Sequence, residues 1–421
     1  MDWRTIARIA RREIAERFLE PQTKQLVTYS EQWKKGLIPT PREAYLGIPN
    51  GPSYSTGVED ATLRGNAFLA SLCDEYDLTY DGEVKTLAHT LFEGIRRTQD
   101  AAEPPGFVPR FVLPDGRSCY PNSSGDQHTI LFYGLWRYVK SPIATAEQKR
   151  AAADITGRVM DRMRKHGWRI VSKDGTNAHA GGQLRGTRLL AVLLAAFKIT
   201  GDNQWLEIFQ HEVHEDLHAM VQQILGDGPG MPPGGGFYGP QQHAELLTIL
   251  AEDDLNWDRR AFFRNARKEI AERFLRDPIP TESHCPTYSD ECKEALGEAA
   301  HIPSPLDAPK HFRPELWGME EDRDWRKDYQ RWVDMDGEPG PSPYIKWWLG
   351  LRPGICHERN CSISPLVAYH VCLLSGDEEL AKTVAEPLER HFDTTDITQA
   401  QKLGSLTGAH AVAVLAMGRE A

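Results

Sequence analysis

The chain has 421 residues, of which 40% are hydrophobic and 26% charged, a composition typical of a globular protein with a sizeable core. Its 60 acidic and 49 basic residues give a formal net charge of −11, and no run of Lys or Arg exceeds a pair, so we expect no nucleic-acid partner. No apolar stretch reaches the roughly 20 residues of a membrane span. The seven scattered cysteines predict neither a disulfide framework nor a structural zinc site.

The first segment, 1–20, is charged and amphipathic and does not resemble a signal peptide. We therefore expect a cytoplasmic protein as the sequence stands, or a periplasmic or secreted one if a signal peptide has been removed. From residue 58 onward, apolar helices alternate with more charged ones. The apolar helices are predicted at 58–78, 125–139, 182–200, 240–253, 361–375 and 404–418. The charged helices that follow the first five are predicted at 82–99, 146–166, 203–224, 257–275 and 378–391.

An amphipathic helix at 3–19 has no partner before it, and the apolar helix at 404–418 has none after it. If these two pack together, the chain forms six inner and six outer helices, so the sequence predicts one all-α domain over 1–421, an (α/α)6 barrel of six helical hairpins. The breaks at 80–82, 200–202 and 375–377 each offer a Gly to end one helix and an Asp to begin the next. A repeat agrees, since ARREIAERFL (10–19) recurs as ARKEIAERFL (266–275).

The hairpin turns are short, whereas the connections leading back into the apolar helices are long and rich in Gly, Pro and aromatic residues. Such loops, gathered at one end of a rigid scaffold, are where binding and catalysis are usually found. The longest is an insertion at about 276–360, and its tryptophans either stack on sugar rings or fasten the loop to the barrel. These are Trp317, Trp325, Trp332, Trp347 and Trp348.

Acidic residues stand at the start of consecutive apolar helices: Glu59 and Asp60 in STGVEDATLRGN, and Asp126 in NSSGDQHT. Hydrolysis of a glycosidic bond needs one protonated carboxyl and a second group that activates water or stabilises the developing cation. These carboxyls would converge at the mouth of the barrel. The alternative is ordinary helix capping, because Asp, Glu and Ser favour the first turn of any helix.

Polar residues near the same helix starts would bind a sugar, and Arg110 in PGFVPRF would clamp a carboxylate. The predicted substrate-binding residues are Arg64, Asn66, Arg110, His128, His179, Arg185, Tyr238, His243, His357 and Trp348. His214-Glu215-Asp216-Leu217-His218 matches the HExxH zinc signature, but the helical phase places its histidines on the solvent side of an outer helix. We therefore predict no metal and no cofactor.

The GVEDATLRGN, PGFVPRF and SSGDQHT segments, with the alternating helices, resemble the six-hairpin glycosidases, especially the unsaturated glucuronyl hydrolases and related glucuronidase-like enzymes. The resemblance implies that two aspartates on successive inner helices carry the chemistry, one protonating the substrate and the other assisting. The matching positions are Asp126 and Asp60, or Glu59 in place of Asp60, since this sequence has an acidic pair there.

We therefore expect a glycoside hydrolase that removes a uronic acid from an oligosaccharide. Three alternatives stay open. A polysaccharide lyase would use Asn66 and Arg110 to neutralise the substrate carboxylate and His128 or Tyr238 to abstract a proton. A sugar epimerase would use paired histidines, and a carbohydrate-binding helical protein would have no catalysis at all.

Overall fold

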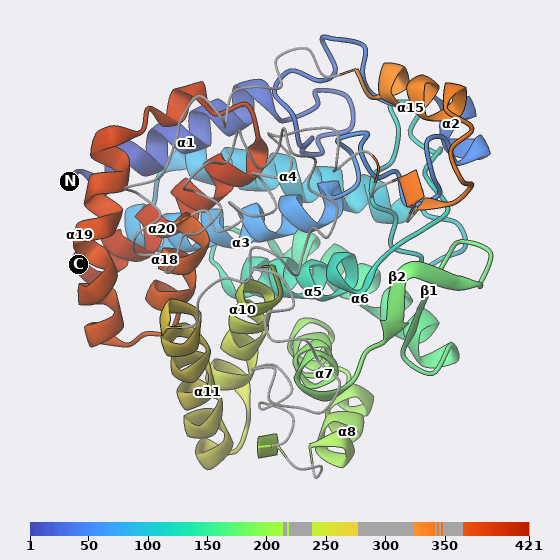
Figure 1. Ribbon diagram of the computed structural model, residues 1–421. Helices are drawn as coiled ribbons and strands as arrows, with labels where there is room; N and C mark the ends of the chain where they lie inside the picture. Colours follow the sequence, from blue (N-terminus) through green and yellow to red (C-terminus); the bar gives the residue numbers. More distant parts are fainter. Residues whose placement is uncertain are drawn as a thin grey trace. The chain divides into compact units, whose positions relative to one another are not determined.

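A computed structural model describes residues 1–213, 217–218, 238–276, 324–341, 343–344, 347 and 365–420. The described chain is built mainly from helices, which confirms the predicted all-α class (Figure 1). It divides into two compact units. The N-terminal unit comprises Ile14–Leu217 and Ile249–Arg260, and the C-terminal unit comprises Met1–Glu13, His218–Thr248 and Ala261–Ala421. The single domain over 1–421 stays a prediction.

The N-terminal unit is a row of helical hairpins: α3 (Ala61–Thr79) with α4 (Gly82–Asp100), α5 (Gly125–Lys140) with α6 (Ala146–Lys165), and α7 (Gly186–Thr200) with α8 (Asn203–Glu212). Helices α3, α5 and α7 contact one another in sequence order, and each also contacts its own hairpin partner (Figure 1). This alternation of inner and outer helices is what the predicted barrel of helical hairpins requires.

Burial explains which helices lie inside. In α5 nearly every residue between Gln127 and Trp136 is buried, and α7 is buried along most of its length. In α4 and α6 only one face is buried, as expected for amphipathic helices that meet solvent on the other side. The Asp residues that begin α4 and α8, Asp81 and Asp202, cap these helices as predicted. The residue that ends α3 in the left-handed conformation is Tyr80, not the predicted Gly82.

Helices α3 and α5 approach closely because Gly134 has no side chain. A Cβ atom at this position would lie 2.6 Å from the backbone oxygen of Asn66 on α3. Glycine is therefore required where these two inner helices cross. The close contact fixes the distance between the starts of the two helices, where the predicted acidic residues lie.

A short hairpin was not predicted. Strands β1 (Arg169–Val171) and β2 (Asn177–Gln183) pair antiparallel in a segment that the sequence analysis left as a loop. Asp174-Gly175 forms the turn between them, with Gly175 at a φ of 87°. The helix predicted from residue 182 therefore begins only at Gly186, after β2 has ended.

In the C-terminal unit, α18 (Pro365–Leu374) contacts both α19 (Glu378–Thr394) and α20 (Leu403–Glu420), with the short turn η2 (Ile397–Gln399) before α20. The helix α1 (Trp3–Arg17) begins beside α20 (Figure 1). Trp3 Nε1 donates to Glu420 Oε1 at 3.0 Å, and the Trp3 ring contacts that of Phe392 edge-on. The predicted pairing of the first and last helices is confirmed.

The two copies of the sequence repeat lie in α1 and in α11 (Trp257–Arg276). Helix α10 (Tyr238–Asp253) directly precedes α11. Three corresponding positions are buried in both copies: Ala10, Arg11 and Ile14 in the first, and Ala266, Arg267 and Ile270 in the second. Arg267 donates to Thr248 Oγ1 at 3.0 Å, which shows how an arginine is accommodated on the buried face of such a helix.

Candidate active site

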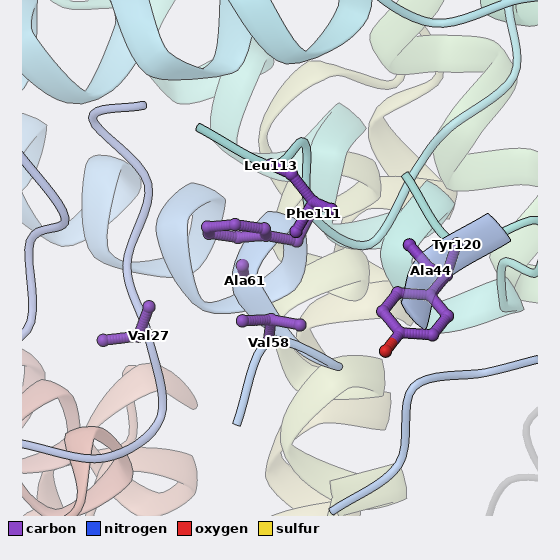
Figure 2. Packing of buried hydrophobic residues seen from close by; sticks show 7 residues of the cluster. All are labelled: Val27, Ala44, Val58, Ala61, Phe111, Leu113 and Tyr120. Carbon is purple, nitrogen blue, oxygen red and sulfur yellow. The ribbon is translucent and has the colours of Figure 1, made fainter. Parts of the chain in front are cut away.

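The loops that precede α3 and α5 pack into one small core beneath the candidate site. Val58 and Ala61 at the start of α3 lie under the ring of Phe111, which comes from the segment before α5 (Figure 2). Ala44, on the short helix α2 (Pro41–Leu46), and Tyr120, from the same segment as Phe111, belong to the same cluster and are almost fully buried. The polar residues of these segments are therefore attached to a well-packed hydrophobic cluster.

Asp60 is the N-cap residue of α3, yet its side chain caps nothing. The backbone amide of Leu63, which an N-cap Asp would normally bind, donates instead to Gln127 Oε1 at 2.9 Å. The amide of Thr62 donates to the backbone oxygen of Arg110 at 3.0 Å. The Asp60 carboxylate is thus available for other contacts.

Asp126 is also free of a capping role. It lies in the first turn of α5, but Ser124 caps that helix by accepting from the amide of Gln127 at 3.4 Å. The Asp126 carboxylate instead faces Arg188 of α7, with Oδ1 3.4 Å from a guanidinium nitrogen. Ordinary capping therefore explains neither aspartate.

Arg110 is the buried counter-charge of Asp60. Its side chain is only 2% exposed and lies 3.7 Å from Asp60 Oδ1. The guanidinium also donates to the backbone oxygen of Glu59 at 2.8 Å and to the Tyr54 hydroxyl at 3.4 Å, and it stacks 5.0 Å from the centre of the Tyr54 ring. Arg110 therefore holds Asp60 and Tyr54 in one arrangement rather than projecting toward a substrate.

Two residues of this arrangement were not predicted. Tyr54 lies in a loop that is clasped by Asn50, whose side chain bonds to both the amide and the carbonyl of Tyr54. Ser53 and Ser55 on either side have φ values of 61° and 79°, a conformation that non-glycine residues seldom adopt. Strain of this kind is common at functional sites. Arg188 is the other residue that was not predicted. It is a cation in the first turn of α7, where the helix dipole disfavours positive charge. This unfavourable placement is the feature of the sequence that could have pointed to Arg188.

The surroundings of Asp126 change its pKa. Burial raises the pKa of Asp126 above the ordinary value, and the nearby Asp60 carboxylate acts in the same direction, whereas Arg188 and Arg110 oppose the shift. Burial likewise raises the pKa of the Tyr54 hydroxyl. A carboxyl whose pKa is raised by burial, near a second carboxyl, is the combination that acid catalysis requires.

The structure places two of the predicted binding residues in the core. Asn66 is fully buried, with its amide donating to the backbone oxygen of Thr62 at 2.7 Å. His128 is 4% exposed, and its Nδ1 bonds to the backbone oxygen of Ser124 at 2.8 Å. Burial lowers the pKa of His128 to about 4. Neither side chain is accessible to a ligand, so Asn66 and His128 do not suit the lyase alternative, whereas the side chain of Tyr238, its other predicted base, lies outside the described residues.

The remaining predicted residues are more dispersed. Arg64 and Glu59 are half-buried at the start of α3, and Arg185 is exposed beside Gln183, to whose Oε1 it donates at 2.9 Å. His243 is half-buried on α10 in the C-terminal unit. The side chains of His179, Tyr238, His357 and Trp348 lie outside the described residues.

The aromatic residues of the insertion pack mainly on each other where the structure describes them. Trp332 follows Trp325 on α15 (Trp325–Asp334), and its ring lies 5.3 Å from that of Trp347 and edge-on to Tyr344, which is 1% exposed. Trp325 is also buried. These tryptophans form a small core of their own, while Trp317 and Trp348 fall outside the described residues.

The HExxH segment is only partly described, since His214, Glu215 and Asp216 lie outside. His211 and His218 are exposed, as predicted from the helical phase. In the part of the chain that the structure describes, no three His, Cys, Asp or Glu residues are arranged to hold a metal ion. None of its described helices is both long enough and apolar enough to cross a membrane.

A small cavity of about 10 Å³ lies beside the start of α3, between Ala61 and Gly65 of that helix and Leu91 and Ile95 of α4. Its volume is that of about one water molecule, so it is not a substrate pocket.

No protein-family model and no curated protein matches the chain. Among solved structures, the GH76A α-1,6-mannanase from Salegentibacter sp. HEL1_6 superposes with a TM-score of 0.35 and 14% sequence identity, over 66% of this chain and 89% of that chain. A likeness of this degree carries no conclusion about activity or substrate.

Proposed function

We propose that this protein is a glycoside hydrolase in which Asp126 is the general acid and Asp60 the second carboxyl. The observation that carries the proposal is that two aspartates begin neighbouring inner helices and neither caps its helix. Each instead faces an arginine, Asp60 with Arg110 and Asp126 with Arg188. Two neighbouring carboxylates that are not needed to cap their own helices suit the pair of carboxyls that glycosidic hydrolysis uses.

The roles follow from the surroundings of each carboxyl. Asp126 has the raised pKa and a side chain that is 36% exposed, so it can keep a proton and still reach a leaving-group oxygen. Asp60 lies against the buried charge of Arg110 and accepts from Gln127, which suits a group that stabilises positive charge or activates water. Asp60 is preferred to Glu59, because Glu59 contributes its backbone oxygen to the same network.

For the substrate we propose a saccharide that ends in a uronic acid. Support comes from the two arginines at the start of α7, since Arg185 is exposed and Arg188 is 28% exposed. A guanidinium that is partly open to solvent can bind a sugar carboxylate through paired hydrogen bonds. Arg110 is too deeply buried for this role, which corrects its predicted use as the carboxylate clamp.

The experiment is to incubate the purified protein with a panel of oligosaccharides that carry glucuronic, galacturonic or unsaturated uronic acids at the non-reducing end, beside neutral analogues, and to analyse products by mass spectrometry. We expect release of the terminal uronic acid with uptake of one water. Parallel ultraviolet measurements detect the conjugated double bond that a lyase would form. Cleavage that proceeds equally well in Asp126→Asn, or products without added water, would contradict the proposal.

A further inference from the structure

The first turn of α3 is capped from outside itself. In the usual arrangement an N-cap Asp accepts a hydrogen bond from the amide two or three residues later. Here the corresponding amides, those of Thr62 and Leu63, donate to the Arg110 backbone oxygen and to Gln127 Oε1. Asp60 occupies the capping position while other residues do the capping.

Gln127 links the Leu63 amide to the Asp60 carboxylate. It is fully buried and directly follows Asp126 on α5. Its Oε1 accepts from the Leu63 amide, and its Nε2 donates both to the Glu59 backbone oxygen and to Asp60 Oδ1, each at 3.2 Å. One side-chain amide therefore binds the start of α3 and the Asp60 carboxylate together.

We propose that Gln127 is a positioning residue that caps α3 in place of Asp60 and so sets the Asp60 carboxylate at a fixed place relative to Asp126. The cap is supplied by the residue next to Asp126, so any movement of α5 carries both carboxyls with it. The consequence for catalysis rests on the proposed function, whereas the exchange of caps does not.

Loss of the Gln127 amide should reverse the exchange. The Leu63 amide would then be buried without an acceptor, and the nearest carboxylate in the ordinary capping position belongs to Asp60. Asp60 would turn toward its own helix and away from Arg110 and Asp126. The fold would survive, because the turn is capped again, but the second carboxyl would be out of place.

The test uses Gln127→Met, which keeps the side-chain volume and removes both polar atoms, in protein labelled with ¹⁵N-leucine. In the wild type, the Leu63 amide resonance should move little as the carboxyls titrate. In Gln127→Met it should move strongly downfield as Asp60 ionises, and Asp60→Ala in that background should abolish the movement. Turnover of the uronic-acid substrate should fall by about a hundredfold, as expected for a catalytic group displaced by about 1 Å.

Two further variants complete the design. Gln127→Glu keeps the acceptor for Leu63 but brings a second carboxyl against Asp60, so it should rescue turnover only at low pH, where the two can share a proton. Gln25→Met is the matched control, because Gln25 is a buried glutamine that bonds to the backbone of Val112 and to neither carboxyl. It should leave both the Leu63 titration and turnover unchanged.

The proposal is overturned if the Leu63 amide follows a carboxyl titration in the wild type, if it does not do so in Gln127→Met, or if Gln127→Met turns over substrate normally. If the wild type hydrolyses no saccharide, the proposed function fails, and the resonance titration alone still decides whether Gln127 replaces Asp60 as the cap.

Discussion

Asp126 illustrates how a buried carboxyl can lower the stability of the fold. Its pKa is raised in the folded protein, mainly by burial, and Arg188 offsets only part of the shift. The folded state therefore binds a proton more tightly than the unfolded chain does. By linkage, this residue lowers the free energy of unfolding as the pH rises from the ordinary Asp pKa through the raised one, and the cost remains above both values.

Replacing Asp126 with Asn should lower turnover by about a thousandfold, the loss typical of a missing general acid. The fold should be retained, because Ser124 and not Asp126 caps α5. Steady-state kinetics and circular dichroism would measure the two effects. A variant with near-native turnover would exclude Asp126 as the acid.

The same substitution predicts a change in the pH dependence of stability. Asp126→Asn lacks the titrating group, so its melting temperature relative to the wild type should increase with pH across the window between the two pKa values. Differential scanning calorimetry at several pH values would show it. A difference independent of pH would mean that burial does not perturb this carboxyl.

Arg188→Gln should move the alkaline limb of the turnover profile to higher pH. Arg188 lowers the pKa of Asp126, so its removal leaves that pKa higher and keeps the acid protonated further into the alkaline range. Arg117→Gln is the matched control, since Arg117 is an exposed arginine of the same unit that pairs with Asp115 and not with Asp126. A limb displaced to lower pH, or displaced equally by the control, would contradict the assignment.

At this scale the sequence identified the two aspartates, because a helix start can be located from the sequence alone. It could not show which side of a helix faces the site. His128 lies about 200° around the helix from Asp126, and Asn66 about 240° from Asp60, so both turn into the core. The sequence did not indicate a role for Tyr54, Gln127 or Arg188, because each makes its contacts with residues on other elements.

At the scale of elements, the close crossing of α3 and α5 depends on Gly134, which has no Cβ atom. Gly134→Ala should destabilise the protein by about 1–3 kcal/mol, because the new Cβ would lie 2.6 Å from the Asn66 backbone oxygen. Denaturant unfolding would measure the change, and any outward shift of α5 should also lower activity.

Gly65→Ala provides the matched control within the same pair of helices. A Cβ at Gly65 meets nothing within 4 Å, and Gly65 borders the small cavity beside α4. This substitution should stabilise the protein by up to about 1 kcal/mol through helix propensity. If both variants behaved alike, the contact at Gly134 would not be what determines the spacing.

The inner and outer helices could be predicted because they are long and their apolar residues recur with the helical period over many turns. Strand β1 has too few residues for any alternation to be visible, and β2 is rich in Gly and Ala. The helix α15 lies within an insertion whose periodicity gives no sign of what it packs against. The formation of such strands and helices depends on contacts between residues far apart in the sequence, which a local sequence pattern does not reveal.

At the scale of the whole molecule, Trp3 fastens the first helix to the last. Trp3→Ala should cost about 3 kcal/mol of unfolding free energy, because it removes a buried ring that contacts Phe392. Trp3→Phe should cost only about 1 kcal/mol, the value of the lost hydrogen bond to Glu420. Equal effects in thermal unfolding would show that the ring contact contributes little.

The hydrogen bond between Trp3 and Glu420 also means that the start of the first helix and the end of the last helix lie close together. A few Gly and Ser residues would bridge the gap between them, since the two side chains are within hydrogen-bonding distance. New ends could then be opened at the exposed turn around Gly201. In such a circular permutant α8 would leave the ribosome first and α7 last, so both aspartates would be synthesised only after about two thirds of the chain. The order of synthesis could then be separated from the order of packing.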